Sequence, residues 1–145
     1  MATTLEQNKA IVKKLIDMTF NKGQLGPEVN ELVADEYVEY LVGPIREKTD
    51  RKGYLALIAE LRVAFPDMDF RVEDIIAEGD HVASRNVWYG THTGPFRGMP
   101  PTGKKVTVTA MGFSRIKDGK VVEHWGQVDF LGMLQQMGVL PPPKS

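Results

Sequence analysis

Residues 105–129, KVTVTAMGFSRIKDGKVVEHWGQVD, determine the fold that we expect for this chain. Apolar and polar residues alternate on both sides of Asp118-Gly119, a pair that favours the two-residue loop of a type I′ β-hairpin. The two flanking segments therefore form an antiparallel pair of strands, 105–116 and 120–129.

The rest of the chain divides into helices and then strands. Helical spacing of apolar residues predicts helices before residue 66, and two-residue alternation predicts strands from residue 69 onward. The segment 34–44 is expected to be irregular or extended. The expected helices span residues 5–21, 27–34, 51–65 and 130–137, and the expected strands span 69–77, 81–91, 105–116 and 120–129. This order indicates an α+β fold, in which helices cover one face of a curved antiparallel sheet and leave a cone-shaped pocket.

Length, composition and charge limit the possible classes of protein. The chain has 145 residues, of which 42% are hydrophobic and 26% charged, as expected for one soluble globular domain, 1–145. A formal charge of −1 argues against nucleic-acid binding, and no apolar run reaches the roughly 18–20 residues of a membrane span. There are no cysteines and no apolar signal segment, so we expect a cytoplasmic protein.

Two apparent motifs are rejected because of their context. Residues 98–105, GMPPTGKK, match seven of the eight positions of a P-loop. However, Lys105 replaces the Ser or Thr that holds Mg²⁺, and a strand follows where a helix is needed. The histidines, His81, His92 and His124, show no paired metal-ligand spacing, so we expect no metal.

The hairpin predicts which side chains share a face. A two-residue loop pairs Gly112 with Trp125 and Val108 with Asp129, and residues two apart lie on one face. The first face then carries Val108, Ala110, Gly112, Trp125, Gln127 and Asp129, and the second carries Met111, Phe113, Arg115, Val122, His124 and Val128. Small residues facing an aromatic wall and a carboxylate would make a cavity on the first face. A β-bulge at Gly112 or Gly126 would shift this assignment.

Asp129 has two interpretations, which are compatible. In a pocket that excludes water its pKa would be raised, and it could act as a general base that moves a proton from carbon to oxygen. As the residue before a short helix, it could equally be the N-cap.

Other residues are candidates for the pocket or for the core. His92, near the turn after the second strand, and His124, on the face opposite Asp129, are interpreted as structural, and His124 could also be interfacial. Arg85 is expected to be half-buried and either to pair with a carboxylate or to hold an anionic or carbonyl group of a ligand. The candidate substrate-binding residues are Tyr40, Arg85, Trp88, Met111, Phe113 and Trp125.

Four stretches carry a family resemblance: FPDMDFRVEDIIAEGDHVASR (65–85), GTHTGPFRGMPPTGKKV (90–106), FSRIKDGKVVEHWGQVD (113–129) and LGMLQQMG (131–138). Together they resemble the SnoaL-like polyketide cyclases, also called ester cyclases, of the nuclear-transport-factor-like superfamily. The resemblance implies an intramolecular aldol ring closure on a hydrophobic carbonyl compound, a polyketide ester, by acid–base catalysis without a metal or cofactor.

The resemblance also assigns roles to individual residues. Asp129 is similar in position to the pocket aspartate that serves the family as general acid/base, and His92 is a candidate helper. Tyr40 stands where many relatives carry a histidine, which puts chemistry that needs a histidine there in doubt. A homodimer through the outer face of the sheet is implied as well.

Other functions remain open at this point. The same fold hosts epoxide hydrolases and ketosteroid isomerases. Arg85 would suit epoxide opening, although no second acid accompanies it. A non-catalytic small-molecule-binding or scaffold protein could use the same pocket, because a fold does not determine function.

Overall fold

The computed structural model describes residues 2–42 and 48–144. The elements within these residues are α1 (Leu5–Ile16), the π-helical turn η1 (Asp17–Asn21), the 3₁₀-helix η2 (Pro27–Glu31), β1 (Val33–Val42), β2 (Lys48–Thr49), α2 (Arg51–Ala64), β3 (Asp69–Glu78), β4 (His81–Thr91), β5 (Lys105–Lys117), β6 (Lys120–Val128) and α3 (Phe130–Gln136). None of the described helices is long and apolar enough to span a membrane.

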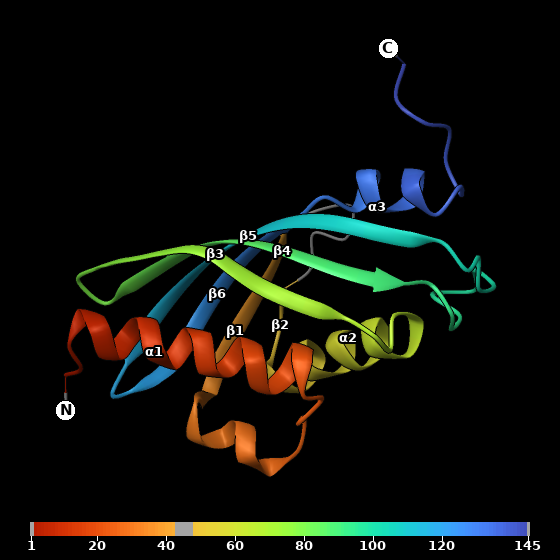
Figure 1. The fold of residues 1–145 in the computed structure, drawn as a ribbon. Coiled ribbons are helices and arrows are strands. Elements are labelled where there is room, and N and C mark those ends of the chain that lie inside the picture. The colour runs from red at the N-terminus through yellow and green to blue at the C-terminus, as the bar shows by residue number, and fades with distance from the viewer. Residues whose placement is uncertain (1, 43–47, 145) are drawn as a thin grey trace.

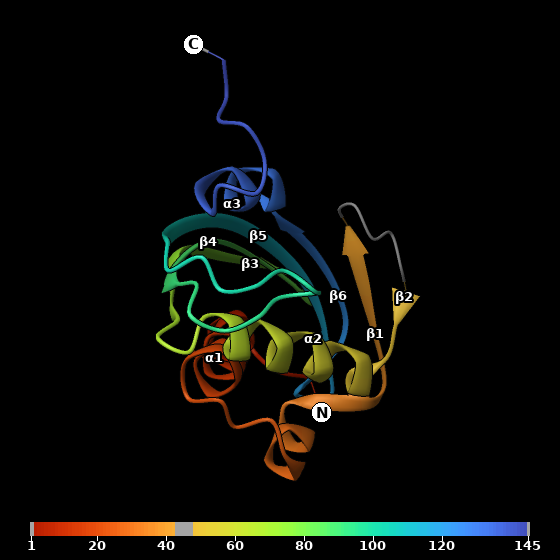
Figure 2. The same cartoon turned by 90° about the vertical axis from the view of Figure 1, so that its right-hand side faces the viewer.

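One curved sheet contains all six strands, in the order β2-β1-β6-β5-β4-β3 (Figure 1). Strands β3 to β6 form the expected antiparallel meander. Helices α1 and α2 lie on the concave side of the sheet, and α3 lies beyond β5, away from both (Figure 2). The predicted α+β class is confirmed. The sheet is mixed rather than purely antiparallel, because β1 runs parallel to β6.

The N-terminal part differs from the sequence-based expectation in two places, and a third segment takes one of its two expected forms. The predicted helix 5–21 ends as an α-helix at Ile16 and continues as a π-helical turn. The predicted helix 27–34 is only a short 3₁₀-helix. The segment 34–44, expected to be irregular or extended, is extended as strand β1 up to Val42, and its last two residues lie outside the described residues. Pairing with the distant strand β6 makes this segment a strand, and that pairing has no local signal.

A β-bulge in the β5–β6 hairpin changes the predicted faces. Ile116 pairs with Val121 as expected, but Arg115 pairs with Glu123, so Val122 is an extra residue. Both valines are buried, Val121 at 1% and Val122 at 3% exposure, and a bulge allows two consecutive side chains to enter the core.

Beyond the bulge every residue of β6 has the opposite orientation from the one predicted. The concave face of the hairpin carries Val108, Ala110, Gly112, Ser114, His124, Gly126 and Val128, and the outer face carries Met111, Phe113, Arg115, Glu123, Trp125 and Gln127. The prediction that Trp125 and Asp129 share a face with Ala110 and Gly112 is therefore wrong. The prediction that a bulge would shift the faces is correct, although the extra residue is Val122 and not a glycine.

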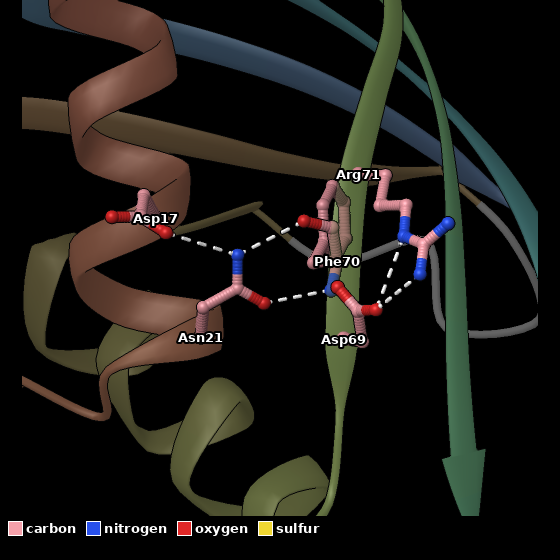
Figure 3. Close-up of polar contacts among 5 residues, drawn as sticks. All are labelled: Asp17, Asn21, Asp69, Phe70 and Arg71. Atoms are coloured by element: carbon pink, nitrogen blue, oxygen red, sulfur yellow. Dashed lines mark hydrogen bonds and ion pairs between the residues drawn. The ribbon is translucent and has the colours of Figure 1, made fainter.

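The end of the π-helical turn is fixed to the edge strand β3 by one amide. Asn21 Oδ1 accepts from the backbone N–H of Phe70 at 2.7 Å, and Asn21 Nδ2 donates to the Phe70 carbonyl at 2.9 Å (Figure 3). The amide thus occupies one pair of open backbone groups on a sheet edge. The rings of Phe20 and Phe70 stack beside it with centroids 4.5 Å apart, which brings both to the concave side of the sheet.

Candidate active site

A cavity of about 120 Å³ lies between the concave face of the sheet and the helices α1 and α2. Its walls are mostly apolar and are formed by Ile16, Phe20, Leu57, Ile58, Leu61, Phe70, Trp88, Ala110, Val128 and Phe130. The ionisable side chains in its lining are Glu39, Tyr54, Arg97 and His124. In the part of the chain that the structure describes, no group of three or more His, Cys, Asp or Glu side chains is placed to hold a metal ion.

Glu39 and His124 form a carboxylate–imidazole pair in this cavity. Nδ1 of His124 lies 2.9 Å from both carboxylate oxygens of Glu39. A carboxylate can only accept, so Nδ1 carries a hydrogen, and in the neutral imidazole Nε2 then keeps its lone pair. Glu39 is buried, with its side chain 3% exposed, whereas the His124 side chain is 26% exposed. The pair therefore places an imidazole, whose neutral form has one proton-accepting nitrogen, in the lining of a mostly apolar cavity.

Two glycines make room for the imidazole. Gly112 and Gly126 are direct partners across the hairpin. A Cβ atom added to Gly112 would lie 2.9 Å from His124 Nε2, and one added to Gly126 would lie 3.1 Å from His124 Cε1. The ring therefore extends over the glycine pair, and larger residues at these positions would displace it.

Two tyrosines lie near the Glu39–His124 pair. The hydroxyl of Tyr37 donates to Glu39 Oε2, and the ring of Tyr54 lies 6.4 Å from the imidazole of His124. Burial, together with the charge of Glu39, raises the pKa of both tyrosines. Both phenols therefore stay neutral at physiological pH, and the Tyr37 hydroxyl remains a hydrogen-bond donor to the carboxylate.

Asp129 lies outside this cavity. It is exposed, and its carboxylate accepts from the backbone N–H of Gly132 at 2.9 Å as the N-cap of α3. The capping interpretation is confirmed. The general-base role stays a prediction, and the side chain has no place among the residues that line the cavity.

His92 is fully buried behind the cavity wall. Its Nδ1 accepts from the backbone N–H of Thr102 at 3.2 Å, and its ring packs against Phe65 with centroids 5.3 Å apart. Its Nε2 has no hydrogen-bond partner among the described residues. These contacts hold the loop that follows β4, and His92 is absent from the cavity lining. Its role as a helper in proton transfer also stays a prediction.

The predicted substrate-binding residues divide between the two faces of the sheet. Trp88 lines the cavity, and Met111 borders it but is 61% exposed. Tyr40, Phe113 and Trp125 lie on the outer face, where the rings of Tyr40 and Trp125 stack 5.1 Å apart.

Arg85 also lies on the outer face. It is exposed, so the expected half-burial is wrong. The expected carboxylate partner is confirmed as Asp74, whose Oδ2 lies 2.8 Å from Arg85 Nε. The strand alternation puts Arg85 on the face opposite its neighbours Ser84 and Asn86, both of which are buried.

Sequence reasoning missed Glu39 and Arg97 and undervalued His124. Glu39 could have been found if segment 34–44 had been interpreted as a strand, because Tyr37 and Glu39 would then share the inner face. Arg97 lies in a Gly- and Pro-rich loop without a periodic signal. The position of His124 depends on the bulge, whose extra residue is an ordinary valine.

Comparison with known proteins gives a consistent result. The sequence profile described as SnoaL-like polyketide cyclase matches residues 10–137. The nogalonic acid methyl ester cyclase of Streptomyces nogalater is 31% identical over 121 residues, which cover 82% of this chain and 89% of that protein. An aklanonic acid methyl ester cyclase of Streptomyces peucetius is 29% identical, with 88% of each chain covered.

Solved structures agree with the sequence matches. IdmH of Streptomyces antibioticus, described as a proposed polyketide cyclase, has a TM-score of 0.81 and 38% identity, and covers 91% of this chain and 99% of its own. AclR of Streptomyces galilaeus, described as a proposed hydroxylase, has a TM-score of 0.84 and 30% identity. The match covers 98% of this chain and 87% of AclR. The profile match extends over most of the chain and the first relative exceeds 30% identity. This chain therefore belongs to the SnoaL-like polyketide cyclase family.

Proposed function

We propose that this protein is a polyketide ester cyclase that closes a ring by an intramolecular aldol reaction, with His124 as the general base. The observation that carries the proposal is the Glu39–His124 pair. In the neutral imidazole, Nε2 of His124 has a free lone pair, and His124 lines a mostly apolar cavity. The relatives named as methyl ester cyclases support a polyketide ester as the substrate class.

The chemistry follows from the protonation states. Nε2 of His124 removes a proton from a carbon that lies between two carbonyl groups, and the electron pair passes into the enolate. The enolate carbon then attacks a second carbonyl of the same molecule, forming one C–C bond and an alkoxide. The imidazolium returns its proton to that oxygen, so the product is an isomer of the substrate and His124 is regenerated.

Glu39 and Tyr37 act on His124 rather than on the substrate. The Glu39 carboxylate fixes the tautomer of His124 and stabilises the imidazolium that forms during the reaction. Tyr37 in turn holds the carboxylate. The apolar walls exclude water, which strengthens these interactions. A cavity of about 120 Å³ accommodates the reacting ring, and the rest of a multi-ring substrate extends to the mouth.

The test is the cyclisation of aklanonic and nogalonic acid methyl esters by His124→Gln and Glu39→Gln. We expect each substitution to lower kcat by about 10²–10⁴-fold, the usual contribution of a general base. Glu39→Gln has this effect because a glutamine carbonyl no longer stabilises the imidazolium. Thermal unfolding and circular dichroism show whether the fold is intact.

His81→Gln is the matched control, because His81 is a surface histidine paired with Asp80. It should leave kcat unchanged. If His124→Gln turns over substrate at the wild-type rate, His124 is not the general base. Binding without any wild-type turnover would favour the non-catalytic ligand-binding alternative.

We also propose that the protein forms a homodimer through the outer face of the sheet. Ile76, Met111 and Phe113 are 69%, 61% and 43% exposed there, and they border one shallow apolar groove. The ion pairs Arg85–Asp74 and Arg115–Glu123 carry both charge signs on this face, which suits a self-complementary contact. Light scattering should give twice the chain mass for the wild type and the monomer mass for Phe113→Glu. A monomeric wild type would contradict the proposal.

A further inference from the structure

We propose that Arg97 is a specificity-determining residue that binds a carboxylate of the substrate at the mouth of the cavity. The inference rests on the proposed function for the location of the site, and it adds a substrate class, carboxylic acids, that the names of the methyl ester cyclases do not include. The observations that support it are the position of Arg97, its free hydrogen-bond donors and its backbone conformation.

Among the described residues that line the cavity, Arg97 is the only arginine or lysine. Its side chain is 40% exposed, so it lies where the cavity meets solvent. The loop that carries it is fixed against α2, because the N–H groups of Thr93 and Gly94 donate to the carbonyl of Ala64 at 3.1 and 3.2 Å. In Figure 2 this loop, which joins β4 to β5, runs beside α2.

The guanidinium of Arg97 is positioned but only partly used. Its Nε donates to Glu60 Oε2 at 3.2 Å, and its Cζ lies 5.6 Å from the centre of the Phe96 ring. The two terminal nitrogens have no hydrogen-bond partner among the described residues. These nitrogens form the fork that binds a carboxylate through two parallel hydrogen bonds.

The backbone at Arg97 indicates that the turn does not require an arginine. The N–H and C=O groups of Phe96 and Met99 bond to each other in both directions, at 3.0 and 2.8 Å, and close a two-residue loop. Both loop residues have positive φ, 45° at Arg97 and 81° at Gly98. Glycine or asparagine is the preferred residue in this type I′ geometry, and other residues are strained there. Arg97 can therefore be replaced by glycine without harming the turn.

The chemistry of the lining selects the ligand class. The cavity walls are apolar, so an aromatic or polyketide ring fills them. Glu39 is already bonded to His124 and Tyr37, on strand β1. Arg97 belongs to the β4–β5 loop and pairs with Glu60 of α2, so it is a part of the lining separate from the Glu39–His124 pair. A ring acid can place its carboxylate on Arg97 while its reacting carbon lies toward His124, whereas a methyl ester offers Arg97 only neutral acceptors.

The test is the binding of benzoate and of its neutral analogue benzamide, measured by NMR titration of wild type, Arg97→Gly, Arg97→Lys and Glu60→Gln. We expect the wild type to bind benzoate about tenfold more tightly than benzamide, as a partly exposed charged hydrogen bond would give. Arg97→Gly should reduce this ratio to about one, and Arg97→Lys should retain part of it. Glu60→Gln should keep or increase the ratio, because it removes the competing anion.

Measurements of stability and turnover distinguish a misfolded variant from a wrong inference about Arg97 and from a wrong proposal about His124. Arg97→Gly should melt no lower than the wild type, since it relieves the positive φ. His124→Gln should keep the benzoate preference, because His124 does not contact the carboxylate. A wild type that fails to bind benzoate, or that binds both probes equally, would overturn the inference, as would a benzoate preference that survives in Arg97→Gly. If turnover does not depend on His124 but the benzoate preference is intact, the proposed role of His124 is wrong and the inference about Arg97 holds.

Discussion

The two faces of the β5–β6 hairpin are built from neighbouring residues but have opposite properties. The concave face has glycine, alanine and serine around a single imidazole, and a buried carboxylate from β1 orients that imidazole. The outer face has large aromatic side chains and paired charges, with Phe113 and Trp125 directly opposite each other. His124 and Trp125 are adjacent in sequence, yet one lies in the cavity and the other on the outer face.

One extra residue produces this difference. Without the bulge at Val122, Trp125 would lie in the cavity and His124 would lie outside it. The pairing register therefore decides whether a polar residue of a strand faces the cavity or the outer face. The register in turn is determined by which side chains the core can bury.

Deletion of Val122 tests this comparison most severely. Without the extra residue, β6 cannot keep both its pairing at the 118–119 turn and the orientation of the side chains beyond the bulge. One buried valine is also lost, because Val121 and Val122 are both in the core. We expect a loss of more than about 4 kcal/mol in the free energy of unfolding, or no folded protein at all. Denaturant titration measures it. Val122→Ala, which keeps the residue count, should cost only about 2 kcal/mol. A deletion variant with normal stability and turnover would show that the bulge is dispensable.

Substitution of the glycine pair affects the concave face alone. Gly112→Ala places a methyl group 2.9 Å from His124 Nε2, so the ring must move. We expect kcat to fall by about 10²-fold with the fold preserved, since displacing a catalytic group by about 1 Å has this effect. Gly126→Ala, with a 3.1 Å contact to Cε1, should have a smaller effect. Thr109→Ala on the outer face is the control, and equal losses in all three variants would argue against a positioned imidazole.

Tyr37 and Tyr40 extend the comparison to β1, since they face the cavity side and the outer side respectively. Tyr37→Phe removes a donor from the buried Glu39 carboxylate and should cost about 1–3 kcal/mol at neutral pH. Tyr40→Phe should change stability within about 0.5 kcal/mol, because it loses only a 3.3 Å contact to Glu123.

The same pair predicts a response to alkaline pH. Burial and the Glu39 charge raise the pKa of Tyr37 well above its usual value. A raised pKa in the folded state gives stability that is present below the ordinary tyrosine pKa of about 10 and is lost as pH rises beyond it. The wild type should therefore lose stability more steeply above about pH 10 than Tyr37→Phe does. Parallel unfolding curves for the two proteins would contradict the assigned burial.

Substitution of Asp129 has the smallest expected effect and compares the two candidate bases directly. Asp129→Ala should cost about 1 kcal/mol through loss of the α3 N-cap, and Asp129→Ser should cost less because serine caps as well. Neither should change kcat. A folded Asp129→Ser protein without turnover would return the general-base role to Asp129 and remove it from His124.

The parts of the fold that depend on local patterns could be predicted from the sequence. Strand β4 has the expected bounds, and β3, β5 and β6 differ from expectation by a single residue at one end. Asp118 and Gly119 both have positive φ, as a type I′ turn requires. Asp50, directly before the predicted start of α2 at residue 51, is its N-cap and accepts from the backbone N–H of Gly53.

The site could not be predicted because it depends on distant pairing. Strand β1 carries charged residues that weaken its alternation, and β6 gives it a parallel partner only in the folded state. The bulge has no local signal, since the turn residues are compatible with either register. The Gly112–Gly126 pair also became interpretable only when the structure placed His124 over it.

The parallel pairing of β1 with β6 has a consequence for how the protein reaches its working state. Glu39 and His124 are 85 positions apart, and closing so long a loop costs more entropy than forming the consecutive hairpins. The meander β3–β6 can form from neighbouring segments, whereas β1 must join it from the other end of the chain. The carboxylate–imidazole contact therefore belongs to the last stage of assembly. A chain emerging from the ribosome has no complete Glu39–His124 pair until residue 124 of 145 has been made and β1 has docked.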